Sequence, residues 1–194
     1  MSDKPSPIKL VTRTRNKWKR TGQQRTTADN ATALGYIIWQ LALNGAKKLH
    51  MEEFRYDSDD QRIRVIEEYL AFLVHLVDRI TFSRLQENER ADFVSEVARA
   101  AARHLERNKE EIIGADNHRA VFLDMLNQRS SEYGSCSYAG EPGYAMLRAL
   151  GLHVQNVMGS DQTNKWTIDQ VIDIDGPDLC RQLINSVNSL LESS

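Results

Sequence analysis

Hydrophobic residues recur at steps of three and four along most of this chain, which is the period of an amphipathic α-helix. The pattern predicts helices over residues 28–51, 59–85, 87–111, 116–131 and 144–158, and a last helix that carries Leu179 to Leu191. Ser58 and Gln61 have the spacing of a capping box, which supports the start of the second helix. The sequence therefore favours a fold built from long helices.

The second predicted helix is apolar on two faces, so we expect it at the centre of a bundle. One face carries Ile63, Ile66, Leu70, Leu73, Val74, Val77 and Ile80, and the other carries Val65, Tyr69, Phe72 and Leu76. The first predicted helix has small residues, including Gly35 and Gly45, beside its hydrophobic stripe. They would allow another helix to approach closely.

Two regions interrupt the helical pattern. Residues 130–143 are rich in small residues and form the longest break, and loops of this length are often functional or disordered. Val171 to Ile174 is the one place where a short strand could lie, and Asp175-Gly176-Pro177 predicts a turn. The predicted fold is all-α: an irregular bundle of five or six helices in a single helical domain, residues 27–194.

Composition agrees with a helical fold, because 4 Pro and 10 Gly in 194 residues are few for a turn-rich β-fold. A content of 41% hydrophobic and 27% charged residues excludes collagen and a fully disordered chain. Cys136 and Cys180 are too few for a disulfide framework. We expect two reduced thiols and a cytoplasmic protein.

The apolar stretch of residues 31–46 is the one candidate for a membrane segment. It falls short of the roughly 20 residues that a span needs, and Gln40 and Asn44 interrupt it. A signal peptide would begin its apolar core nearer the N-terminus. The stretch therefore predicts a buried helix, and a membrane partner is not expected.

Charge is distributed unevenly along the chain, although its net value is only -2. Residues 1–25 carry eight Lys and Arg against Asp3 alone, a net +7, so the remaining residues carry -9. Residues 1–26 also lack apolar periodicity, which predicts a basic N-terminal arm that is flexible or orders on contact. Such a charge distribution bears on partners rather than on fold.

The candidate binding residues of this arm are Arg13, Arg15, Lys17, Trp18, Lys19, Arg20 and Arg25. Cations can neutralise phosphates and an indole can stack on a base, so one interpretation is nucleic-acid binding through residues 1–25. The same arm would suit an acidic protein surface, anionic lipid or the acidic remainder of its own chain. A solvated tail without a specific partner is the remaining interpretation.

His75, Asp78 and Glu68 are candidate ligand-binding residues on the central helix, where all three could share one face. His75 interrupts an apolar run from Tyr69 to Val77. The simplest interpretation is a core histidine that hydrogen-bonds Asp78 or a neighbouring helix. The alternative is a ligand contact or a general base.

Metal chemistry lacks a signature in this sequence. A di-iron bundle needs Glu-x-x-His on two helices, and none of the five histidines has an acidic residue three positions before it. Zinc lacks a Cys-x-x-Cys pair, and an EF-hand containing Asp173 and Asp175 would place Gln182 where calcium needs a glutamate. We predict neither a metal nor a cofactor.

Cys136 is a further candidate, because it lies in a loop of small residues. A nucleophilic cysteine needs a nearby base or helix N-terminus, and the sequence does not place His118 or His153 beside it. No phosphate-binding glycine loop or nucleophile elbow is present in this region. We predict no catalytic residue.

Three functions remain open. The leading hypothesis is a non-enzymatic adaptor or regulatory protein that acts through protein–protein contacts, with an unidentified protein partner; a homo-oligomer is compatible with it. The alternative is a nucleic-acid-associated protein that uses the basic arm. The third is an enzyme or small-ligand binder with a site near His75 and the 130–143 loop.

Overall fold

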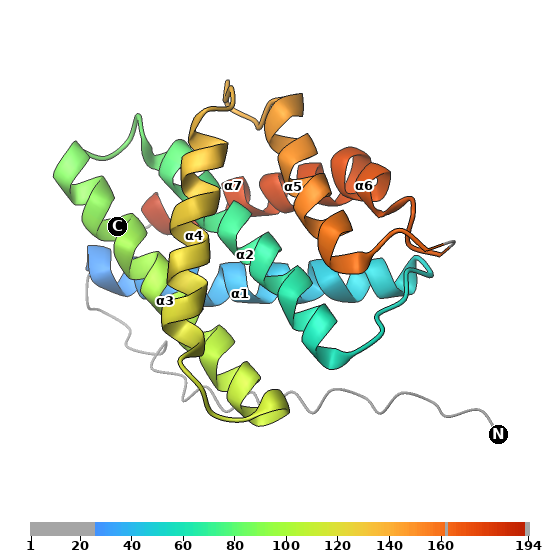
Figure 1. The fold of residues 1–194 in the computed structure, drawn as a ribbon. Helices are drawn as coiled ribbons and strands as arrows, with labels where there is room; N and C mark the ends of the chain where they lie inside the picture. Colours follow the sequence, from blue (N-terminus) through green and yellow to red (C-terminus); the bar gives the residue numbers. More distant parts are fainter. Residues whose placement is uncertain (1–25, 162, 193–194) are drawn as a thin grey trace.

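The computed structural model describes residues 26–161 and 163–192 (Figure 1). In it, the segments with helical periodicity form the expected helices. The elements are α1 (Thr27–Met51), α2 (Asp59–Thr81), α3 (Glu87–Ile113), α4 (His118–Gly134), α5 (Tyr144–Met158), α6 (Thr167–Gln170), the π-helix η1 (Val171–Asp175) and α7 (Gly176–Leu191). The predicted all-α bundle is confirmed, with six long helices in the part of the chain that the structure describes. The predicted basic arm, with its candidates Arg13 to Arg25, lies outside the described residues.

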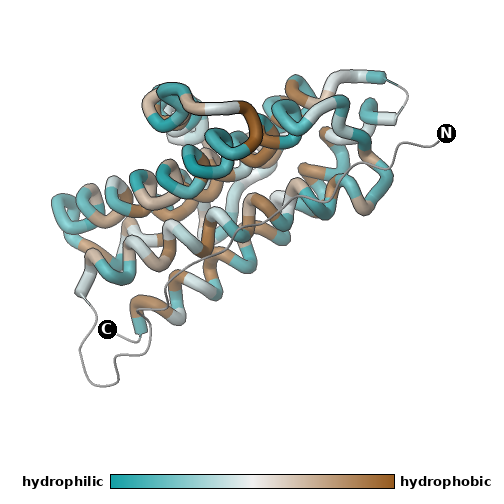
Figure 2. The backbone as a smooth tube through the Cα atoms, turned by 90° about the horizontal axis from the view of Figure 1, so that it is seen from below, coloured by the Kyte–Doolittle hydropathy of each residue, from teal (hydrophilic) through white to brown (hydrophobic). Residues whose placement is uncertain are grey.

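Helix α2 is the centre of the bundle, as its two apolar faces predict. It contacts α1, α3, α4, α5 and α7, and 16 of its 23 residues are buried. In Figure 1 it lies in the middle of the view, among the other long helices. Figure 2 shows hydrophobic and hydrophilic positions alternating along each helix, as expected where one stripe of each helix faces the core.

The predicted close approach of helices occurs at two glycines of α1. A methyl group added at Gly35 would overlap Ala100 Cβ of α3 and lie 3.0 Å from the Val97 carbonyl oxygen. One added at Gly45 would lie 3.1 Å from the Tyr69 ring of α2. Glycine thus permits the spacing of α1 against both α3 and α2.

Local hydrogen bonds explain where α2 and α1 begin. Ser58 Oγ accepts from the Gln61 backbone N–H at 3.1 Å, as predicted, but Gln61 Oε1 accepts from Asp57 N–H rather than from Ser58. Helix α1 begins with a complete capping box between Thr26 and Asp29, which the sequence analysis did not single out.

The stretch around Asp175 contains neither the short strand that could have lain there nor the predicted turn. Val171–Asp175 is a π-helix, and Gly176 N–H donates to the Val171 carbonyl, five residues earlier. Pro177 lies in the first turn of α7, the helical position that proline favours. The turn interpretation was wrong because glycine and proline here continue a helix.

The break predicted at residues 130–143 is shorter than expected, because α4 continues to Gly134. Tyr133, in this last turn, is fully buried and so binds the end of α4 to the core. Within the described part of the chain, no helix is both long and apolar enough to cross a membrane.

Candidate functional site

The three polar candidates of α2 face different partners. Asp78 Oδ1 accepts from Arg90 Nη1 at 2.8 Å. Glu68 accepts two hydrogen bonds from Arg129 of α4, at 2.8 and 2.7 Å, and only 4% of Glu68 is exposed. These contacts tie α2 to the start of α3 and to α4, so neither carboxylate is paired with His75.

His75 lies in the core, 5% exposed, with its ring centroid 5.6 Å from that of Tyr133. Among the described residues, its Nε2 atom has no hydrogen-bond partner, and neither has the buried Tyr133 hydroxyl. Burial, reinforced by the charge of Arg79, lowers the His75 pKa to about 4, while Asp78 opposes the shift. His75 is therefore neutral near pH 7. It is buried, as the core interpretation expects, but the hydrogen bond to Asp78 that this interpretation included is absent, because Asp78 pairs with Arg90.

The neighbourhood of Tyr133 brings in two further titratable groups. The Tyr133 ring lies edge-on to His153, at 6.3 Å, and His153 Nε2 is 2.7 Å from Glu132 Oε2. Cys136 Sγ contacts the Glu132 carbonyl oxygen at 3.8 Å. His118 is engaged elsewhere, at 2.7 Å from the Gly114 carbonyl. The predicted His75–Cys136 region is thus a packed junction of α2, α4 and α5.

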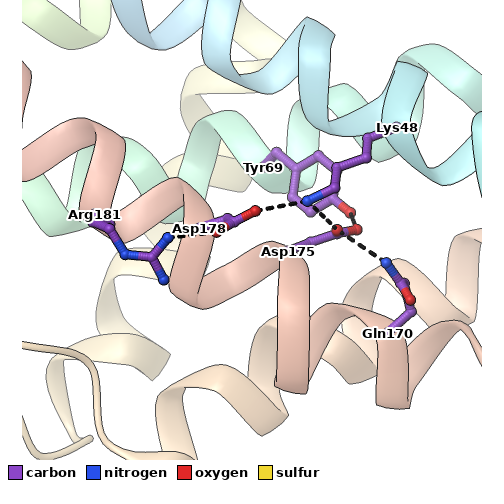
Figure 3. Close-up of polar contacts among 6 residues, drawn as sticks. All are labelled: Lys48, Tyr69, Gln170, Asp175, Asp178 and Arg181. Atoms are coloured by element: carbon purple, nitrogen blue, oxygen red, sulfur yellow. Dashed lines mark hydrogen bonds and ion pairs between the residues drawn. The ribbon is translucent and has the colours of Figure 1, made fainter.

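A second buried polar network surrounds Asp175 at the junction of η1 and α7 (Figure 3). The Tyr69 hydroxyl donates to Asp175 Oδ2 at 3.0 Å, and Gln170 Nε2 donates to Oδ1 at 3.3 Å. Lys48 Nζ lies 4.0 Å from Asp175 Oδ1 and 2.6 Å from Asp178 Oδ2. One carboxylate thereby joins α1, α2, α6 and the π-helix.

Burial is the main influence on the charge of this network. It raises the pKa of Asp175, which is 1% exposed, although the hydrogen bonds from Tyr69 and Gln170 and the charge of Lys48 oppose the shift. The hydrogen bond to Lys48 lowers the pKa of Asp178 and raises that of Lys48. The exposed side of the network is therefore an ion pair, and its inner side is a carboxylate held by neutral donors.

A surface groove lies where the α1–α2 connector meets the loop after α5. These two segments share one end of the molecule in Figure 1. The groove, a hollow of about 620 Å³, is lined by His50, Glu52, Glu53, Phe54, Arg55, Thr163 and Trp166, and we call it the Trp166 groove. Trp166 is 60% exposed. A large aromatic side chain thus faces solvent on a concave surface.

The walls of the Trp166 groove are fixed by Asn164, which is fully buried. Its Oδ1 accepts from Arg55 N–H at 3.0 Å, and its Nδ2 donates to the carbonyls of Arg55 and Met158 at 2.9 and 3.0 Å. Glu53, at φ 70°, is the one described non-glycine residue with positive φ. Such backbone conformations persist where surrounding contacts hold them, and they concentrate at functional sites.

The sequence analysis missed this groove and the Asp175 network as sites. Its one usable signal is a tryptophan among polar neighbours, Thr163 to Thr167, in a connecting segment. Among residues 26–161 and 163–192, no three His, Cys, Asp or Glu side chains are grouped so that they could hold a metal ion. Comparison with known families, curated proteins and solved structures gives no match for this chain.

Proposed function

We propose that this chain is a cytoplasmic, non-enzymatic adaptor that binds a partner protein through the Trp166 groove. The observation that carries the proposal is the 60% exposure of Trp166 on the wall of a preformed hollow. Tryptophan and arginine are the residue types most enriched among those that dominate binding energy in protein interfaces, and Arg55 lines the same groove.

Rigidity supports a binding role for this surface. Asn164 fixes the loop that precedes Trp166, and Gln170, one helical turn beyond Trp166, donates to the buried Asp175. Lys48, two residues before His50, joins the same network. A preformed surface loses little conformational freedom on binding, so more of the contact energy is retained as affinity.

The test compares partner capture by the full-length wild-type protein, by Trp166→Ala and by a matched control, Phe82→Ala. Phe82 is 66% exposed and lies at the end of α2, so the control removes a similar area of exposed aromatic surface. Each protein is immobilised and exposed to nuclease-treated lysate of its source organism, and captured proteins are quantified. We expect a stoichiometric partner whose recovery falls at least tenfold with Trp166→Ala alone, as for an interface residue worth about 1.4 kcal/mol or more.

Equal recovery with both variants, or no stoichiometric partner, would contradict the proposal. The second candidate function, nucleic-acid binding through residues 1–25, is favoured by eight cations within 25 residues. Omitting the nuclease tests it in the same experiment. It predicts nucleic acid that is recovered from both variants and is lost steeply as salt increases.

A further inference from the structure

We propose that the occupant of the Trp166 groove is an arginine- and lysine-rich segment of the partner protein. This inference rests on the proposed function, since it names the partner chemistry of the same groove. It follows from the charges that flank the groove and from the exposed face of Trp166.

Acidic residues concentrate on the two segments that form the groove. Residues 52–60 contain five Asp and Glu against Arg55, a net -4, and residues 161–173 contain three Asp against Lys165, a net -2. Together these two short segments account for -6 of the -9 that residues 26–194 carry. Most of the net negative charge of residues 26–194 is therefore carried by the two segments that contribute the lining of the groove.

Part of this charge is already used within the fold, and part faces the groove. Asp59 pairs with Arg62, and Asp161 accepts from the backbone N–H groups of Thr163 and Asn164. Glu52 and Glu53, in contrast, line the hollow and are exposed. They offer two carboxylates to a cation that enters the groove.

Trp166 adds an interaction that favours cations over other ligands. An ammonium or guanidinium group over an indole face is attracted by the ring quadrupole. Lys165 Nζ already lies 5.4 Å from the Trp166 ring centroid, so a cation is accommodated at this ring. Carboxylates and an indole together match the planar, weakly hydrated guanidinium of arginine especially well.

The same charges argue against the competing classes of occupant. A nucleic acid or an acidic peptide would bring its negative charges against Glu52 and Glu53, and like charges at an interface repel each other. A purely apolar peptide would make no contact that uses the two carboxylates. A cationic segment is the occupant that satisfies the carboxylates and the indole at once.

The test measures binding of a fluorescein-labelled peptide of alternating arginine and serine to the full-length protein by anisotropy. A peptide of alternating glutamate and serine serves as the charge control. The first variant, Glu52→Gln with Glu53→Gln, removes the groove carboxylates. Its matched control, Glu87→Gln with Glu89→Gln, removes two exposed carboxylates from the start of α3.

We expect the arginine peptide to bind and the glutamate peptide not to bind. The Kd should rise at least fivefold in the groove variant and in Trp166→Ala, and should stay within twofold in the α3 variant. Raising the salt concentration should weaken binding, because the groove carboxylates are exposed. Equal weakening in both double variants would mean that only net charge matters, and it would overturn the proposal.

Two further outcomes would also overturn it. The first is no binding by the wild-type protein. The second is binding that appears only when the eight Lys and Arg of residues 1–25 are changed to Gln, which would assign the groove to the chain's own arm. The proposed function fails separately, since it depends on the loss of a captured partner with Trp166→Ala. A captured partner that binds through the groove without an arginine- and lysine-rich segment would leave that function standing and refute this inference.

Discussion

Acidification should destabilise the fold through His75, and the expected size follows from its burial. The His75 pKa falls from 6.5 in the unfolded chain to about 4 in the folded protein. The unfolded chain therefore binds the proton more tightly than the folded protein does. Linkage then makes stability complete above pH 6.5 and progressively smaller as the pH falls from 6.5 toward 4.

The magnitude comes from the two pKa values. Between about pH 7.5 and pH 5, the protonation of His75 in the unfolded chain should lower the free energy of unfolding by about 2 kcal/mol. A difference of this size is a large fraction of the stability of a typical domain, about 5–15 kcal/mol. It should be visible as a shift in the urea midpoint of helix loss.

The assay measures urea unfolding at both pH values for wild type, His75→Leu and Phe72→Leu. His75→Leu removes the titratable ring, so its loss of stability on acidification should be smaller than that of the wild type by about 2 kcal/mol. Phe72 packs on the same Tyr133 ring, at 5.8 Å between centroids, and carries no titratable atom. Phe72→Leu should therefore lower stability equally at both pH values.

An equal loss of stability in wild type and in His75→Leu between the two pH values would contradict this prediction. Such a result would mean that His75 titrates alike in the folded and unfolded chains. Other groups cannot produce the difference, because they are present in both proteins.

Two other stability predictions follow from packing and pairing, each measured by urea unfolding at neutral pH. Gly35→Ala should lower the free energy of unfolding by about 1–3 kcal/mol, because its methyl group would overlap Ala100. The control Gly134→Ala meets no atom within 4 Å, so it should be neutral or slightly stabilising. Equal effects of the two substitutions would refute the close approach of α1 and α3. Glu68→Gln should lower the free energy of unfolding by about 3 kcal/mol, because it leaves the charge of Arg129 largely buried beside a neutral amide. Adding Arg129→Met should restore part of this stability. A double variant that is less stable than Glu68→Gln alone would contradict this prediction.

The positions of the helices were predictable because each helix buries one face, so apolar residues recur in the sequence at the helical period. Helix α5 begins and ends at the predicted Tyr144 and Met158, since Gly159 adopts φ 81° and ends it. The π-helix was not predictable in this way. Its packing depends on Gly151 of α5, where an added methyl group would lie 3.0 Å from Ile168 and Ile172. This contact depends on tertiary packing, which the local sequence pattern does not reveal.

The candidate sites show the same difference between local features, which the sequence predicts, and contacts between helices, which it does not. His75 was recognisable because a polar residue interrupts an apolar run, and the structure confirms that it is buried. Its neighbour Tyr133 was not recognisable from the sequence, because it lies on another helix, 58 positions away. The pairing of Asp78 with Arg90 rather than with His75 likewise depends on how α3 turns back along α2. Spacing identifies which residues share a face, but not which helix covers them.

The Trp166 groove shows why a binding surface can be absent from the sequence pattern and still be built by the fold. Its two walls are joined by Asn164 and Arg55, 109 positions apart, through backbone-to-side-chain hydrogen bonds. Gln170, one helical turn beyond Trp166, donates to the buried Asp175, which also accepts from Tyr69. Polar groups buried in this way destabilise the folded protein unless each has its hydrogen-bond partner. The network therefore favours one arrangement of the walls. An exposed indole and two carboxylates on such walls are positioned before any partner arrives, which is the condition under which a few contacts suffice for specific binding.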